Sequence, residues 1–491
     1  MTERDSASPA SRALKRVAMC MGIVYLLTFL FYLNGPQSRS RTAKEIFAWF
    51  LVLSLLFLFW RGYQAVNNAT YISPRLVVGL GVMLCLLACL IFPFHSTDVF
   101  GYINRGWQQV HYDQNPFVYF LGDIKGWEQD PMLRDHWIYN PIPYGFLFAL
   151  LCRVLVKAGN GNWWLTLFLF KSVNVLAYGT TAWLVWLGAK RLGHARPIVA
   201  LYCFLWNPLI LMHHIANGHN DILVGCLIVL SMYLAIIGAG LWIIPVLVAG
   251  TFLKYATLPL LPLAFIFVVK KNGWRVALLG SLIGFVVAVL SSAPYLHDWQ
   301  SFRVTDIRMN ATLIDNSLHS LLIHIFENVA RLLPVLAPLH GAVDNIIKMT
   351  LRLAFLIFFI AQFRKLKDLS ATILIEKSTL ILFALICVAS SKFNAWYLGM
   401  LLPLALLLRE RHWLRRLVLL VTGAELLSLT FFKQAYMLNY FAMILVPGWL
   451  IFRQERKQKA VAGANDELPP NAAFTSPSSQ KELSEAFYAS D

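Results

Sequence analysis

The dominant feature of the sequence is a series of apolar runs, many close to twenty residues long, separated by short loops that carry lysine and arginine. A helix of about 20 apolar residues is long enough to cross the hydrocarbon core of a bilayer. A single soluble core does not keep growing beyond about 250 to 300 residues, whereas this chain has 491 residues and is 58% hydrophobic and only 14% charged. The pattern predicts an all-α polytopic membrane protein, a bundle of about 14 transmembrane helices. The expected spans are 15–33, 46–62, 76–93, 165–189, 197–215, 221–237, 241–254, 257–270, 275–294, 343–362, 373–391, 396–409, 414–431 and 436–452.

The basic residues indicate the orientation of these spans. The chain has 42 Lys and Arg against 25 Asp and Glu, a net charge of +17, but the cations lie in short loops and form no patch of a soluble nucleic-acid-binding domain. Because cytoplasmic loops of membrane proteins collect Lys and Arg, we expect a multi-pass plasma (inner) membrane protein with both termini cytoplasmic and no nucleic-acid partner. We expect residues 1–459 to form one membrane domain. Residues 460–491, rich in Ala, Ser, Pro and Glu, are expected to form a disordered cytoplasmic tail.

Two long stretches between the expected spans fall on the outer side. The first extends from Phe94 to about Trp164 and the second from Tyr295 to about His340. Each contains an apolar or amphipathic piece that is too short to span comfortably, which predicts helices lying in the membrane interface. A membrane protein with large, structured outer loops is more suited to chemistry at that face than to simple conduction.

The first long loop begins with an acidic residue at the end of a span. If FHSTDVFGYINRGWQQ is helical, His95, Asp98, Tyr102, Arg105 and Gln109 share one face. A carboxyl group near a low-dielectric boundary should have a raised pKa and be suited to accept a proton. The alternative is structural, with Asp98 capping the helix after Ser96 and Thr97 or pairing with Arg105.

The same loop is dense in aromatic residues interleaved with acids between Phe94 and Tyr144. This combination suits a sugar, because aromatic faces stack on its C–H faces and carboxylates accept hydrogen bonds from its hydroxyl groups. For any single residue, the alternative is an ordinary aromatic belt at the membrane interface.

A second polar cluster follows the expected span 197–215, where the chain reads HHIANGHND from His213 to Asp221. Three histidines and an aspartate in nine residues could bind a metal. A tight turn at Gly218 with polar groups lining an aqueous cavity needs no metal, so a divalent cation stays an alternative. Ionisable groups near or inside a membrane indicate a functional site in either case.

Cationic residues that could hold a phosphate lie in the same part of the expected topology. Lys254 stands between two short apolar halves, and Arg303 and Arg308 lie in the second long loop. Lys392 precedes the sequence Asn394–Tyr397. The alternatives are snorkelling of the lysines to the interface and ordinary solvation of the arginines.

With these residues in view, the chain resembles the integral-membrane GT-C glycosyltransferases, in the branch of α-mannosyltransferases that depend on polyprenol-phosphate mannose. The resemblance covers roughly residues 76–410 and departs from the family pattern at Phe146 and Ala395, where proline is common. Its motifs in chain order are Ser96-Thr97-Asp98-Val99-Phe100 with Tyr102, Asn115-Pro116-Phe117, Pro143-Tyr144-Gly145, Gly218-His219-Asn220-Asp221, the short helical pair around Lys254, and Ala395-Trp396-Tyr397.

The resemblance implies a GT-C-like bundle with a large first catalytic outer loop and inverting transfer of a sugar, most simply mannose, from a polyprenyl-phosphate donor to a glycan or glycolipid acceptor at the outer membrane face. Asp98 would be the general base. Lys254, Arg303 and Arg308 would bind the donor phosphate. The residues expected to shape the sugar and acceptor site are His95, Tyr102, Arg105, Asn115, Tyr144, His219, Asn220, Asp221, Trp396 and Tyr397. The competing classes are a polytopic transporter or lipid flippase, and a structural or assembly protein of the membrane.

Overall fold

The computed structural model describes residues 8–140, 142–297, 316–364, 369–430 and 440–466, and side chains are described up to residue 456. Throughout these ranges the regular elements are helices, which confirms the all-α prediction. Those that overlap the expected spans are α2 (Pro9–Phe31), α3 (Arg41–Asn68), α4 (Pro74–Leu90), α7 (Trp163–Arg191), α8 (Pro197–Leu205), α10 (Asp221–Ile236), α11 (Ile243–Leu253), α12 (Leu260–Asn272), α13 (Trp274–Ser292), α16 (His340–Ala361), α17 (Ala371–Phe383), α18 (Leu398–Ala405), α19 (Trp413–Glu425) and α21 (Val446–Asp466).

Local sequence explains where several of these helices begin. Pro9, Pro74 and Pro197 occupy the first turns of α2, α4 and α8, where a missing N–H costs nothing because that group has no partner inside the helix. Ser8 caps α2 by accepting a hydrogen bond from the N–H of Ser11, and Asn162 caps α7 in the same way.

Five helices in the described ranges are long and apolar enough to cross a membrane: Pro9–Phe31, Arg41–Asn68, Pro197–Ala216, Trp274–Tyr295 and Ala371–Ala389. They differ in burial. In Pro197–Ala216, 94% of the most apolar window is buried, against 28% in Trp274–Tyr295. The first therefore packs on all sides against protein, whereas the second leaves an apolar face open, as a helix in contact with lipid would.

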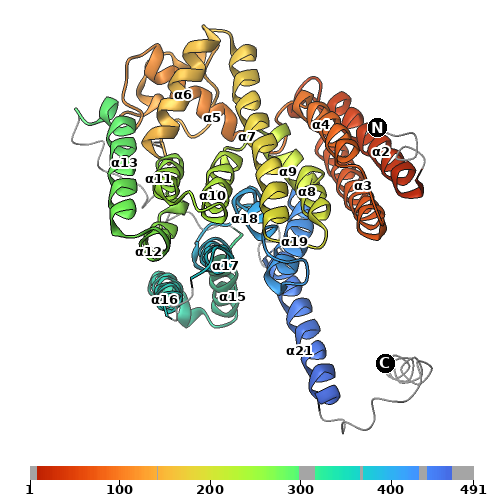
Figure 1. Cartoon of the computed structure of the whole chain (residues 1–491). Helices are drawn as coiled ribbons and strands as arrows, with labels where there is room; N and C mark the ends of the chain where they lie inside the picture. The colour runs from red at the N-terminus through yellow and green to blue at the C-terminus, as the bar shows by residue number, and fades with distance from the viewer. Residues whose placement is uncertain (1–7, 141, 298–315, 365–368, 431–439, 467–491) are drawn as a thin grey trace.

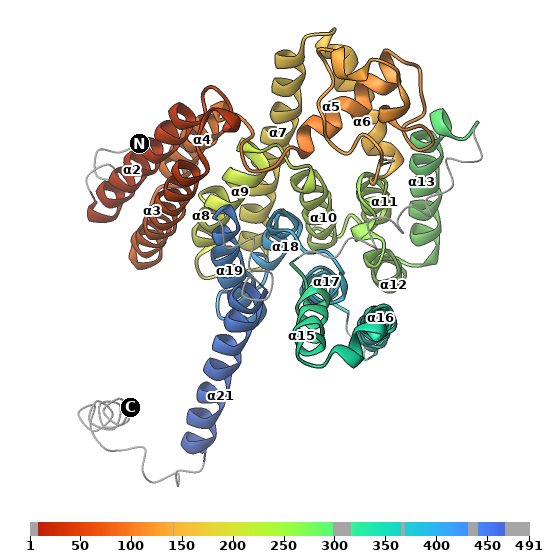
Figure 2. The same ribbon diagram turned by 180° about the vertical axis from the view of Figure 1, so that it is seen from behind.

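Figures 1 and 2 show how the helices are grouped. Helices α2, α3 and α4 stand together at one side, α10 and α18 lie near the middle, and α13 lies at the opposite side. The first long loop folds over one end of this bundle. We call this end the loop end.

The first long loop is itself a packed structure. It contains the helices α5 (Asp98–Val110) and α6 (Phe146–Gly159) and two short 3₁₀ turns between them. Leu121, Leu133 and Ile138 form a small buried cluster under this loop. The loop is therefore ordered enough to hold side chains in fixed positions at the end of the bundle.

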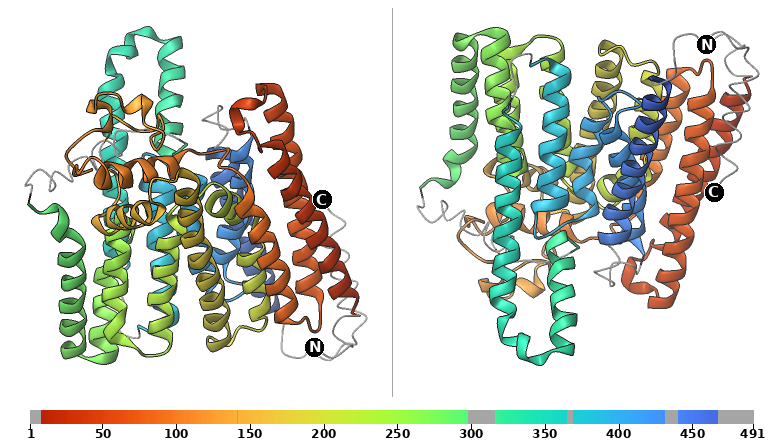
Figure 3. Two further views of the ribbon diagram at one scale, coloured as in Figure 1. Left: turned by 90° about the horizontal axis from the view of Figure 1, so that it is seen from above. Right: turned by 90° about the horizontal axis from the view of Figure 1, so that it is seen from below.

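The second long stretch forms a helical hairpin. Helix α15 (Leu318–Leu332) lies where the sequence indicates an amphipathic piece, and it pairs with α16 through His319 and Asp344, whose side chains are 2.8 Å apart. Figure 3 shows this hairpin projecting beyond the first long loop at the same end of the molecule. At the C-terminus, α21 extends to Asp466, past the expected boundary at residue 460. The rest of the expected tail lies outside the described residues.

Candidate functional site

Asp98 lies in the first turn of α5 at the loop end. One carboxylate oxygen is 3.4 Å from Nε2 of His136, and the other is 3.3 Å from Nδ1 of His219. The Asp98 side chain is 21% exposed, so it is accessible at the mouth of a largely buried site. Both contacts are longer than a charged hydrogen bond of about 2.7–2.9 Å. Catalytic contacts are often long before substrate binds and tighten afterwards.

The segment that leads into Asp98 is held from two directions. The Nζ of Lys171, buried in α7, donates to the carbonyls of Cys89 and Ile91 at 2.9 and 2.5 Å, which satisfies carbonyls at the C-terminal end of α4. The Oδ1 of Asn217 accepts from the backbone N–H groups of Phe94 and His95 at 2.9 and 2.8 Å. These contacts fix the backbone just before the acid.

The turn that supplies His219 needs an unusual backbone. The chain passes from α9 (Pro208–Ile210) into a π-helix, η4 (Leu211–Ala216), and then turns at Gly218, whose φ is +79°. A Cβ at Gly218 would also lie 3.1 Å from Val99 of α5, so glycine allows both the turn and the close approach of α5. The side chain of Asn174 donates to the carbonyls of His214 and His219 and closes the turn.

The electrostatic state of Asp98 differs from the sequence-based expectation. Burial by itself raises the pKa of the carboxyl group, as expected from its position, but the contacts from His136 and His219 outweigh that effect and hold the pKa of Asp98 well below its ordinary value. The predicted raised pKa is therefore wrong. The sequence showed the apolar boundary but not the two imidazole rings that face the carboxylate.

Lys254 is brought into the same site, and it has a partner. Its Nζ is 2.6 Å from Oδ1 of Asp221, whose side chain is only 1% exposed. The ammonium group also lies over the rings of Tyr397 and Tyr144, at 4.3 and 5.8 Å from their centroids. Asp221 and two aromatic faces thus hold a cation with 18% of its side chain exposed.

Tyr144 reaches this position because Gly145 lets the loop approach α11. A Cβ on Gly145 would lie 2.1 Å from the carbonyl oxygen of Phe252, and the Gly145 N–H donates to the carbonyl of Leu253 at 3.1 Å. The hydroxyl groups of Tyr144 and Tyr102 are 3.3 Å apart. Burial raises the pKa of both phenols well above the ordinary value, so both remain neutral hydrogen-bonding groups.

Aromatic stacking fixes the rings around His219. The imidazole of His219 stacks on Trp396, with ring centroids 4.0 Å apart and an angle of 12° between the planes. The ring of His213 lies 5.8 Å from Trp396 and 5.4 Å from the ring of His95. The structure thus brings His95, His219 and Trp396 together from three distant parts of the sequence.

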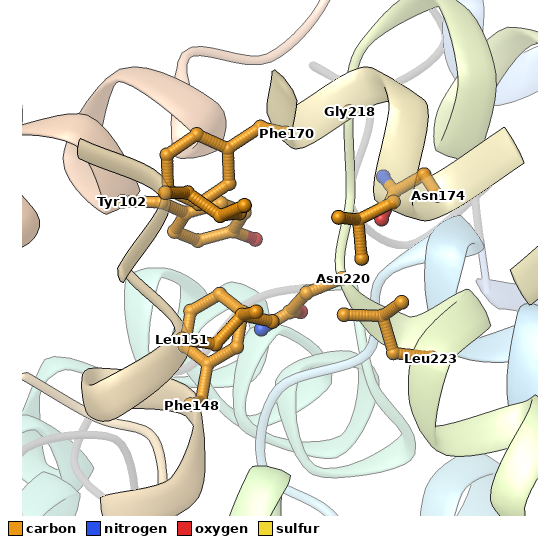
Figure 4. A pocket seen from close by; sticks show the side chains of 10 residues that line it. Tyr102, Phe148, Leu151, Phe170, Asn174, Gly218, Asn220 and Leu223 are labelled. Carbon is orange, nitrogen blue, oxygen red and sulfur yellow. The ribbon is translucent and has the colours of Figure 1, made fainter. Parts of the chain in front are cut away.

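A mostly apolar pocket includes Tyr102 and Asn220 in its lining, and Figure 4 shows its side chains. It is lined by Tyr102, Phe148, Leu151, Leu155, Phe170, Val173, Asn174, Gly218, Asn220 and Leu223. Asn220, a predicted sugar-binding residue, is 2% exposed, and within the described residues neither atom of its amide has a hydrogen-bond partner. A buried unpaired amide costs about 1–3 kcal/mol, a cost that a bound polar group would remove.

Three other predicted residues have different surroundings. His95 precedes α5, which begins at Asp98, so the expectation that His95 shares a helix face with Asp98 is wrong; Asn217 binds the backbone of this non-helical segment. Arg105 does not pair with Asp98: it donates to Gln108 and to the carbonyls of Trp137 and Asn140. Asn115 lies in a turn, where its Oδ1 accepts from the N–H of Phe117 at 3.1 Å.

Arg303 and Arg308, predicted to bind phosphate, lie outside the described residues. Among the residues that are described, no three His, Cys, Asp or Glu side chains are grouped so that they could hold a metal ion. The histidines of the turn instead pack against aromatic rings and against Asp98.

Sequence reasoning did not identify His136 or Asn217 as site residues. His136 lies in the acidic, aromatic loop, and its Nδ1 also hydrogen-bonds to the hydroxyl of Thr97 at 2.7 Å, beside Asp98. The sequence carried a signal for Asn217, since it lies inside the HHIANGHND segment. No local pattern pointed to His136, because its contact with Asp98 depends on how the loop folds.

Comparison with known proteins indicates a family for this chain. A family model described as "Alpha-(1->6)-mannopyranosyltransferase, N-terminal domain" matches residues 14–270, a range that includes Asp98, His136, His219 and Lys254. Alpha-(1->6)-mannopyranosyltransferase A of Corynebacterium glutamicum is 26% identical over 152 residues, which is 30% of this chain and 30% of that protein.

The family match covers more than half of the chain and contains both segments that contact Asp98. Together with the apolar helices, it identifies a membrane protein of a glycosyltransferase family. The chain belongs to the alpha-(1->6)-mannopyranosyltransferase family.

Proposed function

We propose that the protein transfers mannose from a polyprenyl-phosphate donor to a hydroxyl group of a glycan or glycolipid, at the outer face of the plasma membrane and with inversion at the anomeric carbon. The observation that carries this proposal is Asp98 held between two histidines at the loop end, close to the aromatic and cationic groups around Lys254. The family name favours an α-(1→6) linkage.

In this reaction Asp98 is the general base. The acceptor oxygen attacks the anomeric carbon, the bond from that carbon to the phosphate oxygen breaks, and the bonding electrons leave with the polyprenyl phosphate. The acceptor hydroxyl becomes strongly acidic only as the new bond forms, and its proton then passes to the Asp98 carboxylate. A low pKa serves this role, because it keeps the carboxylate deprotonated until the proton is released.

The departing phosphate gains negative charge, and Lys254 is placed to stabilise it. Asp221 and the ring faces of Tyr144 and Tyr397 hold the ammonium group in a fixed position. A cation positioned before the reaction stabilises developing charge without reorganisation. Arg303 and Arg308 stay predicted phosphate ligands. We assign His95, Tyr102, His219, Asn220 and Trp396 to the sugar site.

The donor suits a membrane-embedded enzyme. A polyprenyl chain stays in the bilayer while its sugar projects to the surface, so the enzyme needs apolar helices beside a polar site. The chain has apolar helices that could cross a membrane, and the ordered loop at the loop end bears Asp98.

The test is reconstitution of the purified protein in liposomes with labelled polyprenyl-phosphate mannose and an α-mannoside acceptor. We expect Asp98→Asn to lower transfer about 10²–10⁴-fold, the usual contribution of a general base. Asp123→Asn is the matched control, because Asp123 is an exposed acid of the same loop. Wild-type transfer by a stable Asp98→Asn protein would overturn the base assignment. If mannose is transferred from a nucleotide sugar but not from the lipid-linked sugar, the assignment of a polyprenyl-phosphate donor is wrong.

A further inference from the structure

The exposed ring of Trp137 has no part in the reaction scheme above, yet it lies next to His136, which contacts the proposed base. It follows His136, and the two rings meet edge to face with centroids 5.8 Å apart. The Nε2 of His136 is also 3.4 Å from a carboxylate oxygen of Asp98. His136 therefore contacts both the Trp137 indole and the carboxylate.

The backbone of Trp137 is strained. Its φ is +53°, a left-handed conformation that a bulky residue rarely adopts. Strain of this kind persists only where the surrounding structure enforces it, and it is frequent in ligand-binding segments. The conformation therefore holds the indole in one direction at a cost to stability.

Two buried residues of α5 enforce this conformation. Arg105 donates to the carbonyls of Trp137 and Asn140, and Asn104 donates to the carbonyl of Arg134 at 2.7 Å. The side chain of Asn104 also accepts from the N–H of Arg134 at 3.0 Å. Segment 134–140, which we call the strained loop, is thus fixed to the helix that begins with Asp98.

A cation from a distant part of the chain lies over the indole. The Nζ of Lys392 is 5.2 Å from the ring centroid of Trp137, and Lys392 lies four residues before Trp396, which stacks on His219. Even with this neighbour, Trp137 is 43% exposed. A large apolar ring left open beside a site of acids and imidazoles is suited to a ligand with both apolar and polar faces.

We propose that Trp137 and Lys392 form the acceptor subsite, a platform on which a hexopyranose ring of the acceptor glycan stacks while one of its hydroxyl groups points to Asp98. The C–H face of the sugar lies on the indole, and the Lys392 ammonium donates a hydrogen bond to a ring hydroxyl. This inference rests on the proposed function, since it assigns the position of the acceptor in that reaction.

The test removes the ring without adding strain. Trp137→Gly deletes the platform, and glycine adopts a positive φ freely, so the backbone is expected to remain folded. Trp137→Phe keeps a smaller aromatic face. Tyr139→Ala is the matched control, because Tyr139 belongs to the same loop and is 63% exposed. The measurements are acceptor KM at saturating donor, donor KM, and the Kd of an α-linked mannose oligosaccharide by isothermal titration calorimetry.

We expect Trp137→Gly to raise the acceptor KM and the oligosaccharide Kd about tenfold, comparable with the loss of a stacked base from an aromatic side chain, and to leave the donor KM unchanged. Trp137→Phe should recover part of the affinity, and Lys392→Met should weaken binding less. If Trp137→Gly keeps the wild-type acceptor KM and oligosaccharide Kd, Trp137 is not a platform for the acceptor. The same conclusion follows if Tyr139→Ala loses as much acceptor affinity as Trp137→Gly.

The binding measurement separates this inference from the proposed function. If the wild-type protein transfers no mannose but binds the oligosaccharide, and Trp137→Gly abolishes that binding, the platform stands and the proposed function fails. If the wild-type protein transfers mannose and Trp137→Gly keeps full acceptor affinity, the function stands and the platform fails.

Discussion

Two segments of the protein each contribute a histidine to Asp98, and they differ in almost every other respect. The turn from His213 to Asp221, which we call the buried turn, supplies His219 with 0% of its side chain exposed. The strained loop supplies His136 with 14% exposed. In the buried turn the positive φ belongs to Gly218, for which it is easy, whereas in the strained loop it belongs to Trp137, for which it is costly.

The difference separates a fully enclosed histidine from a partly exposed one. His219 is stacked on Trp396 and enclosed by protein, so it has few other positions available. His136 lies in a solvent-facing loop and also hydrogen-bonds to Thr97. We therefore expect the buried turn to contribute most to the position of Asp98 and the strained loop to contribute mainly to its lowered pKa.

The largest effect should come from the buried turn. His219→Phe preserves the stacked ring on Trp396 but removes the nitrogen that faces Asp98, and we expect kcat to fall about a hundredfold, equivalent to about 2.7 kcal/mol in the activation barrier. The measurement is single-turnover transfer in liposomes. His111→Phe is the control, because His111 also stacks on a tryptophan, Trp107. Unchanged kcat in His219→Phe would show that the buried turn is not needed to position the base.

A smaller effect should follow from loosening the connection between the buried turn and Asp98. Asn217→Ala removes the acceptor of the Phe94 and His95 N–H groups. Because buried unpaired groups cost about 1–3 kcal/mol, the free energy of unfolding should fall by that amount. Thermal unfolding in detergent measures the loss of stability.

We also expect kcat to fall about tenfold in this variant, since small misplacements of catalytic groups are costly. Asn162→Ala, which removes the exposed cap of α7, should lower stability without lowering kcat. If both variants lose stability and neither loses activity, Asn217 only supports the fold.

The smallest effect at neutral pH should come from the strained loop. His136→Gln removes one of the two contacts that hold the pKa of Asp98 below its ordinary value, while burial still raises it. The pKa must therefore rise, and since the base has to be deprotonated, the acid limb of kcat/KM should move to higher pH. Near neutral pH we expect only a several-fold loss, because the carboxyl group stays mostly ionised there.

The matched control for His136→Gln is His324→Gln. His324 also contacts an acid, Glu327, but it lies on the projecting hairpin. It should leave the pH profile unchanged. An acid limb of His136→Gln that coincides with the wild-type limb would mean that His219 alone sets the basicity of Asp98, which would remove the proposed division between the two segments.

Much of the fold could be predicted because helices in a membrane follow from local composition. The apolar runs coincide with helices from α2 to α21, and a helix satisfies its backbone hydrogen bonds within its own segment. The start of α5 was harder to predict from the sequence. The spacing of His95 and Asp98 suggested one helix, but Asn217, more than a hundred positions away, binds the backbone before Asp98. A long-range hydrogen bond leaves no trace in local periodicity.

The same distinction applies to the candidate site. The residue types near Asp98 and in the HHIANGHND segment were recognisable because acids and histidines are unusual beside apolar helices. The pairing of Lys254 with Asp221 and the contact of His136 with Asp98 were not, because each joins segments far apart in the sequence.

By itself the sequence determined that this protein is a helical membrane protein, and it predicted Asp98 as the base. These properties follow from the order of apolar and polar residues along the chain. The tertiary structure alone decided the two histidine partners of Asp98, the lowered pKa of its carboxyl group and the backbone conformation of Trp137. A pKa and an orientation depend on distances in space, and packing sets those distances between segments that the sequence keeps apart.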